Sequence, residues 1–292
     1  MRYLSGSAFR QALEERLRNQ HLESGVPFNR LRKMIAFERF IARLTYTHPK
    51  FWVLKGGLAL QLRLGERART TKDMDLMHMA DEKESHQVLR QAGDTNLDDW
   101  FLFEVGQRSN KPDDLFGGNR YPVRALLDGR EFENFHIDVG VSDVLIGRTD
   151  TLEFSSLLSF AEISPATIEC YPIPQQIAEK FHAITRPYTS GESSRTKDLI
   201  DILLLAGLGP IDAKELSQAL ITTFSHRETH TLPTEMPTVP ISWDRSFSRL
   251  AKQVNLPYDT LSISVSATDS FLTPILQMAT VKQWNPIRWE WD

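Results

Sequence analysis

The chain has 292 residues, of which 41% are hydrophobic and 25% are charged, and its formal net charge is −4. These values are ordinary for a globular protein, and they exclude a disordered chain, a fibrous repeat and an overall basic field. No apolar run approaches the roughly 18 to 20 residues of a membrane span, so we expect a cytoplasmic protein without membrane partners. The single cysteine, Cys170, lies among apolar residues, which favours a buried structural thiol.

The first half of the chain predicts two helices followed by alternating strands and helices. Apolar side chains recur at helical spacing over Phe9–Gln20 and Phe28–Thr45. Phe51–Leu54 is a β-prone run that ends at a Lys-Gly-Gly turn, and Leu58–Leu64 then resumes helical character. The elements expected next, in chain order, are a strand at 73–77, a helix at 82–91, and strands at 101–105, 121–127 and 135–141.

After about Glu162 the remaining segments all have helical patterns, at 174–185, 194–205, 213–224, 244–253 and 268–278. We therefore predict an α+β fold with a small mixed sheet in residues 1–165, including the leading helices, and a helical lobe in residues 166–292. Three tryptophans near the end, Trp284, Trp289 and Trp291, are expected to pack the tail onto the body.

Two carboxylates two residues apart are the first candidates for chemistry. Asp73 and Asp75 lie on a predicted strand, so both side chains project from the same side and can hold one or two divalent cations, for which Mg²⁺ is the natural choice on a triphosphate. Asp138, on a later alternating strand, can supply a third metal ligand or a catalytic base. An isolated Asp-x-Asp pair is also common on exposed strand edges, so it needs support from its surroundings.

That support lies upstream, where Gly56 and Gly57 follow a strand and open a helix. Without side chains, their backbone amides can approach a phosphate group closely. Arg63, Arg67, Arg69 and Lys72 form a basic stretch between this turn and the aspartates. The ordered set of strand, glycine turn, helix, basic segment and Asp-x-Asp strand predicts an NTP site with metal-dependent transfer chemistry.

The helical lobe carries a second candidate group. Gln176 and Lys180 share one helix face, and Asp198 and Asp201 share a face of the next helix. Lys180 can neutralise triphosphate charge, and Asp198 can orient the triphosphate or act on the acceptor. A structural Lys–Asp ion pair would leave the same pattern.

Two sequence blocks resemble the AbiEii-type nucleotidyltransferase toxins, which belong to the polymerase-beta-like superfamily and include the MenT-like toxins. The first block is Leu54-Lys55-Gly56-Gly57-Leu58-Ala59-Leu60 with Arg69-Thr70-Thr71-Lys72-Asp73-Met74-Asp75-Leu76. The second is Gln176-Ile177-Ala178-Glu179-Lys180-Phe181-His182-Ala183 with Ser194-Arg195-Thr196-Lys197-Asp198-Leu199-Ile200-Asp201. The resemblance runs from about Arg30 to the C-terminal tryptophans. One departure is Gly57, which stands where the wider superfamily has serine, so backbone amides replace a hydroxyl.

The resemblance implies a toxin of a type IV-like toxin–antitoxin system that transfers NMP from an NTP to RNA, with the 3′ end of tRNA as the favoured acceptor, and so blocks translation. It implies Mg²⁺ at Asp73 and Asp75 and a cognate antitoxin as partner. The residues that it assigns to the phosphate side are Lys55, Gly56 and Gly57, and those that it assigns to completing the active site are Lys180 and Asp198. Thr71 matches a Ser/Thr that some members expose to modification by the antitoxin.

Three alternatives compete with this interpretation. A metal-dependent nucleotide-sugar glycosyltransferase also uses an Asp-x-Asp pair, but the glycine turn and the helical N-terminus argue against it. A nucleotide-binding regulatory protein without turnover would keep the fold, and the intact carboxylates and Lys180 argue against that. An antitoxin would not need a helical lobe of this length.

Overall fold

The computed structural model describes residues 2–78, 85–110, 118–140, 144–188 and 193–292. These residues form two compact units. The first unit comprises Met1–Arg63, Thr70–Asp143 and Thr149–Cys170, and the second comprises Leu64–Arg69, Val144–Arg148 and Tyr171–Asp292. Among the described residues no helix has the length and apolar character needed to cross a membrane.

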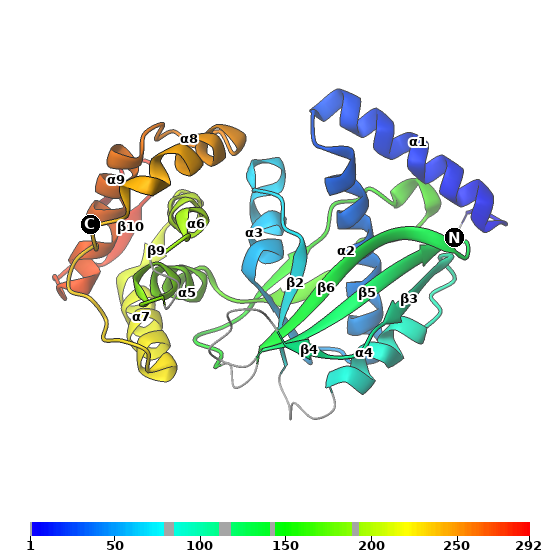
Figure 1. Cartoon of the computed structure of the whole chain (residues 1–292), viewed down its shortest axis with the longest axis horizontal. Helices are drawn as coiled ribbons and strands as arrows, with labels where there is room; N and C mark the ends of the chain where they lie inside the picture. Colours follow the sequence, from blue (N-terminus) through cyan, green and yellow to red (C-terminus); the bar gives the residue numbers. More distant parts are fainter. Residues whose placement is uncertain (1, 79–84, 111–117, 141–143, 189–192) are drawn as a thin grey trace. The chain divides into compact units, whose positions relative to one another are not determined.

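An eight-stranded mixed sheet forms the centre of the first unit (Figure 1). Seven strands follow the order β3-β5-β6-β2-β1-β8-β7, and β4 pairs with β5. The β2–β6 and β1–β8 pairs are parallel and the other pairs are antiparallel. The strands are β1 Trp52–Lys55, β2 Asp73–His78, β3 Phe101–Val105, β4 Ser109–Asn110, β5 Asn119–Leu127, β6 Arg130–Gly140, β7 Asp150–Glu153 and β8 Thr167–Cys170.

Helices of the first unit pack against this sheet. The helices of the first unit are α1 Gly6–Ser24, α2 Phe28–Thr47, α3 Gly56–Leu64, whose last residue belongs to the second unit, and α4 Ser85–Asp94. Phe37 and Phe40 of α2 pack edge-on against Phe135 of β6. Along β5, Tyr121, Val123 and every second residue are buried, while the residues between them face the other way. One face of the sheet therefore packs into the core. The other face carries polar side chains on β5 and β6, although Val53 of β1 and Met77 of β2 are buried on it.

The second unit is mainly helical, with a three-stranded sheet of order β11-β10-β9. Its elements are α5 Ile173–Thr185, α6 Thr196–Ala206, β9 Ile211–Asp212, α7 Ala213–Arg227, α8 Asp244–Gln253, α9 Leu261–Leu276, β10 Gln283–Asn285 and β11 Glu290–Trp291. The helices α5 and α6 pack together, as do α5 and α7. Trp284 is fully buried, and its indole N–H donates to the Ala206 carbonyl at 2.9 Å. The prediction that the tryptophans pack the tail onto the body is confirmed.

The α+β class and the mixed sheet agree with the sequence prediction, but several elements do not. The chain after Glu162 is not entirely helical, because it contains β8 and the small sheet β9–β11. The last helix begins at Leu261 rather than at 268, and Thr260 caps it by accepting a hydrogen bond from the Ile263 amide at 3.3 Å. Residues 82–84 of the predicted 82–91 helix lie outside the described residues.

Candidate active site

A left-handed glycine joins β1 to α3. Gly56 has φ +67°, and a Cβ atom built there would lie 2.1 Å from Oδ2 of Asp75. Any larger residue would therefore collide with the carboxylate and would also be strained by its backbone conformation. The sequence predicted a strand, a glycine turn and a helix at this point, and the structure adds that Gly56 makes room for Asp75.

Four charged residues form a row across four neighbouring strands. Lys55 of β1 is the register partner of Asp75 on β2, and Asp75 is the partner of Asp138 on β6. Asp138 is in turn the partner of Arg120 on β5. Register partners share a face of the sheet, so the strand order β1-β2-β6-β5 alone brings these side chains together. The structure thus unites Lys55, Gly56, Asp73, Asp75 and Asp138, as the sequence predicted.

Arg120 is a member of this group that the sequence did not reveal. Its Nε and Nη2 donate to the two oxygens of Asp138 at 2.7 and 2.8 Å, and Nη2 also donates to Oδ2 of Asp73 at 3.2 Å. These hydrogen bonds to Asp138, followed by the charges of the aspartates, raise the pKa of Arg120 although burial opposes the rise. His136 of β6 lies near the other oxygen of Asp73, with Nδ1 3.5 Å from Oδ1. Asp73 therefore contacts cationic or imidazole side chains from two strands.

Asp73 and Asp75 suit a magnesium ion better than Asp138 does. Both lie on the same face of β2 and are partly exposed, and Mg²⁺ is commonly bound through one or two carboxylates together with substrate phosphates. Asp138 has only 7% of its side chain exposed, and both of its oxygens accept from Arg120. Within the described ranges, no set of three or more His, Cys, Asp or Glu residues is arranged to hold a metal. The two carboxylates of β2 are of the kind that Mg²⁺ prefers, and Arg120 contacts Asp73 by one long bond but Asp138 by two short ones.

Arg63 and Thr71 contact protein groups. Arg63 Nη2 donates to Oδ2 of Asp150 at 2.7 Å, and only 8% of the Arg63 side chain is exposed. Thr71 is 7% exposed, and its hydroxyl donates to the Asp73 carbonyl at 3.2 Å. A nucleotide contact by either residue, as the sequence predicted, would require these bonds to open.

Lys180 and Asp198 meet in the second unit. Lys180 Nζ lies 2.8 Å from Oδ1 of Asp198 and 2.8 Å from Oδ2 of Asp201. Asp201 is completely buried and also binds Arg69 through a fork of two hydrogen bonds, at 3.0 and 2.9 Å. Arg195 Nη1 is 3.8 Å from Oδ2 of Asp198. The cluster therefore has three cations around two carboxylates.

The carboxylates keep Lys180 charged. Burial alone would lower the pKa of Lys180, but the attraction of Asp198 and Asp201 outweighs burial and raises it. Burial likewise acts to raise the pKa of Asp201, and Lys180 and Arg69 outweigh it and lower that pKa. Both shifts favour the charged forms of Lys180 and Asp201. Gln176 of the same helix instead donates to the Tyr171 carbonyl at 3.1 Å.

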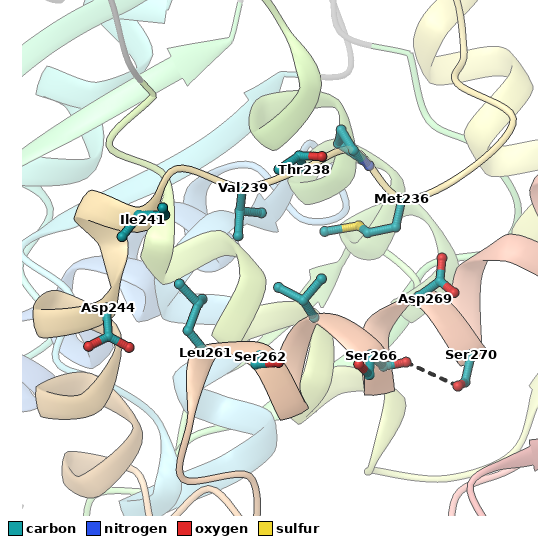
Figure 2. Close-up of a pocket in the computed structure, with 12 residues that line it drawn as sticks. Met236, Thr238, Val239, Ile241, Asp244, Leu261, Ser262, Ser266, Asp269 and Ser270 are labelled. Atoms are coloured by element: carbon teal, nitrogen blue, oxygen red, sulfur yellow. Dashed lines mark hydrogen bonds between the residues drawn. The ribbon is translucent and has the colours of Figure 1, made fainter.

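Two other features, Cys170 and a cavity in the second unit, do not have the properties expected of a transfer site. Cys170 is fully buried, and burial raises the pKa of its thiol to about 12, as expected of a structural residue. A cavity of about 670 Å³ in the second unit lies between residues 236–241 and α9. Figure 2 shows Met236, Val239 and Leu261 between these two segments. Among the described residues that line it there is no Lys, Arg or His to bind a phosphate.

Comparison with protein families identifies the family of this chain. Residues 39–262 match the model of the nucleotidyl transferase AbiEii toxin family of type IV toxin–antitoxin systems. The chain belongs to this family. The matched region of this AbiEii-family chain contains every residue of both clusters.

Solved structures with a similar fold include MenT4, a nucleotidyltransferase toxin from Mycobacterium tuberculosis. It aligns with a TM-score of 0.63 and 16% identity over 94% of this chain and 92% of that chain. JHP933 from Helicobacter pylori aligns with a TM-score of 0.41 and 16% identity over 84% of this chain and 91% of that chain. A comparison with curated protein sequences gave no match. The likeness to MenT4 supports the nucleotidyltransferase fold of the AbiEii-family chain.

Proposed function

We propose that this AbiEii-family chain transfers NMP from an NTP to RNA in the cytoplasm, with the 3′ end of tRNA as acceptor, and thereby blocks translation. A cognate antitoxin would be its partner. The observation that carries the proposal is the row of charged side chains from Lys55 to Arg120 beside the Gly56 turn. The carboxylates of this row can bind a metal ion, and its cations can bind phosphate oxygens.

The residues of the first unit would bind and orient the triphosphate. Asp73 and Asp75 would hold Mg²⁺, which when bound neutralises phosphate oxygens and favours transfer to the acceptor. Gly56 leaves its side of the turn open, so that backbone amides and Lys55 can approach the phosphates. The role of Asp138 as a third ligand or a base stays a prediction.

The residues of the second unit would act mainly through charge. Lys180 is held by Asp198 and Asp201, so its ammonium group keeps a defined position from which to bind triphosphate oxygens. Asp198 would keep Lys180 oriented during transfer. Arg195 would add a second, more exposed positive charge.

The experiment that tests the proposal combines purified protein, Mg²⁺ and total tRNA with each α-³²P-labelled NTP. We expect label on tRNA from one NTP and loss of at least about 99% of it in Asp75→Ala, because a metal ligand supplies several kcal/mol of catalysis. Asp94→Ala, at an exposed carboxylate that ends α4, is the matched control and should keep full activity. Absence of label from all four NTPs would contradict the tRNA acceptor.

The matched family is one of nucleotidyltransferases, so the comparisons do not support the glycosyltransferase alternative. A regulatory role without turnover makes a distinct prediction, because nucleotide would then bind while no label reaches any acceptor. Equilibrium binding of each NTP, measured beside the transfer assay, separates that outcome from an enzyme tested on the wrong RNA.

A further inference from the structure

Arg120 binds two carboxylates unequally. It grips Asp138 with two hydrogen bonds at 2.7 and 2.8 Å, in the fork geometry that suits a guanidinium and a carboxylate. It reaches Asp73 with a single longer bond of 3.2 Å from Nη2. The bond to Asp73 is the weaker contact and will break first when another cation approaches.

The guanidinium cannot leave the cluster by losing a proton. Arginine stays charged at every physiological pH, and the carboxylates raise the pKa of Arg120 further. Only 20% of the Arg120 side chain is exposed, so its charge is less screened than that of a surface arginine. A divalent cation at Asp73 would therefore meet a fixed positive charge that must move away physically.

We propose that Arg120 is a resident counter-cation that competes with the divalent metal for Asp73, and that Asp138 is the positioning residue that keeps Arg120 in place. Metal binding is then weak until a triphosphate arrives. A phosphate oxygen of the triphosphate then accepts the hydrogen bond that Arg120 Nη2 had donated to Asp73. This couples the metal to the nucleotide. The inference rests on the proposed function in taking Asp73 and Asp75 as the metal site.

The sequence-based prediction for Asp138 is the rival assignment. If Asp138 is a metal ligand, Arg120 must release both of its oxygens, and three carboxylates then bind the ion. If Asp138 holds Arg120, only the bond to Asp73 opens. The two assignments predict different Mn²⁺ affinities when Asp138 is removed from a chain that already lacks Arg120.

The first test measures Mn²⁺ binding to the full chain without nucleotide, by the loss of the free-ion electron paramagnetic resonance signal. We expect Arg120→Gln to bind Mn²⁺ about tenfold more tightly than the unmodified chain, because a nearby positive charge has been removed. Arg124→Gln is the matched control. Arg124 lies on the same face of β5 but pairs with Glu104, and it should leave the affinity unchanged within about twofold. Equal or weaker binding by Arg120→Gln would overturn the proposal.

Further variants locate the effect. Arg120→Lys keeps the positive charge but lacks the two parallel hydrogen bonds of the guanidinium. Its Mn²⁺ affinity should lie between those of the unmodified chain and Arg120→Gln, an order that a general loss of folding would not produce. Adding Asp73→Asn to Arg120→Gln should abolish the gain. Adding Asp138→Asn to Arg120→Gln removes a neighbouring negative charge and should weaken Mn²⁺ binding by no more than about tenfold, whereas a fall of more than about a hundredfold would establish Asp138 as a ligand and overturn its positioning role.

The Mn²⁺ measurement is independent of the RNA acceptor. If the unmodified chain labels RNA while Arg120→Gln gains no affinity, the competition fails and the transferase proposal stands. If Arg120→Gln gains affinity while no RNA is labelled, the transferase proposal fails and the competition stands.

Discussion

The two charged clusters use the same kinds of residue, but they differ in which residues are buried. In the first unit Asp138 is buried, but Asp73 and Asp75 are partly exposed, and 32% of the Asp73 side chain is accessible. In the second unit the acids are buried, with 3% of the Asp198 side chain and none of that of Asp201 exposed. Charges that face solvent can exchange partners with a ligand, whereas buried charges depend on the partners they have. Substitutions should therefore impair chemistry in the first cluster and folding in the second.

The largest expected effect is on stability, from Asp201→Ala. This change leaves Lys180 and Arg69 without the buried carboxylate that both contact, and removal of one partner from a buried ionic group costs about 3–5 kcal/mol. Urea unfolding followed by circular dichroism measures the free energy of unfolding directly. Lys180 would also lose one of its two positioning contacts.

The matched variant in the first cluster is Asp73→Ala. Its carboxylate is partly exposed and its bond to Arg120 is single, so we expect a loss of about 1 kcal/mol or less. Transfer activity should nevertheless disappear. Equal destabilisation by the two substitutions would break the contrast between the clusters.

Gly56→Ala should combine a moderate loss of stability with a large loss of activity. A left-handed backbone costs a residue with a Cβ about 1–2 kcal/mol, and the contact with Asp75 adds to that. Because the new methyl group displaces the Asp75 carboxylate, we expect transfer to fall at least about a hundredfold, equivalent to about 2.7 kcal/mol.

Gly129→Ala isolates the backbone contribution. Gly129 has φ +68°, close to the value at Gly56, but nothing lies within 4 Å of the position of its Cβ. It should lose a similar amount of stability from strain alone and keep normal transfer activity. If both variants were equally active, the close approach of Gly56 to Asp75 would have no functional importance.

The local parts of the first cluster could be predicted from sequence because each consists of residues that are adjacent in the chain. The strand, the glycine turn and the alternating Asp73-Met74-Asp75 run are local patterns. Arg120 could not be found in this way. It reaches Asp73 and Asp138 only through the register of β2, β5 and β6, and its separation from Asp73 is 47 residues.

The missed elements show where sequence patterns are weak. The edge strand β7 and its neighbour β8 have only four residues each, too few for periodicity to distinguish them from loop. The first turns of α9 contain Ser262, Ser264 and Ser266, which obscure its apolar stripe. A signal was present in Thr260, because threonine is a favoured N-cap and its side chain does cap the helix.

A smaller effect is expected from pH, through His182 on the same helix as Lys180. His182 is 3% exposed, and burial, followed by His230, Arg227 and Arg186, lowers its pKa to about 3. Its Nε2 lies 2.8 Å from the Thr229 hydroxyl. The unfolded chain binds a proton at a pKa of about 6.5, so the contribution of neutral His182 is complete above that pH and is lost as pH falls from about 6.5 towards 3.

We expect the free energy of unfolding to fall by about 2 kcal/mol between pH 7 and pH 5, less than the full shift implies because pH 5 is still well above the folded-state pKa. Urea titrations at the two pH values measure this change. His182→Gln, which cannot be protonated, should flatten the dependence over this range. An unchanged slope in the variant would assign the acid sensitivity to other groups.

The smallest expected effect is that of Thr71→Val, which removes a hydroxyl next to the aspartates while keeping the shape of the side chain. The lost bond to the Asp73 carbonyl is neutral, and such bonds contribute about 0.5–1.5 kcal/mol, so stability should fall by about 1 kcal/mol and transfer by less than about threefold. A much larger loss of transfer would mean that Thr71 itself binds nucleotide. Mass spectrometry of the chain co-expressed with its antitoxin tests modification separately. Because Thr71 is only 7% exposed, a modified hydroxyl would first have to leave the Asp73 carbonyl, and its added negative charge beside Asp73 would then repel the triphosphate.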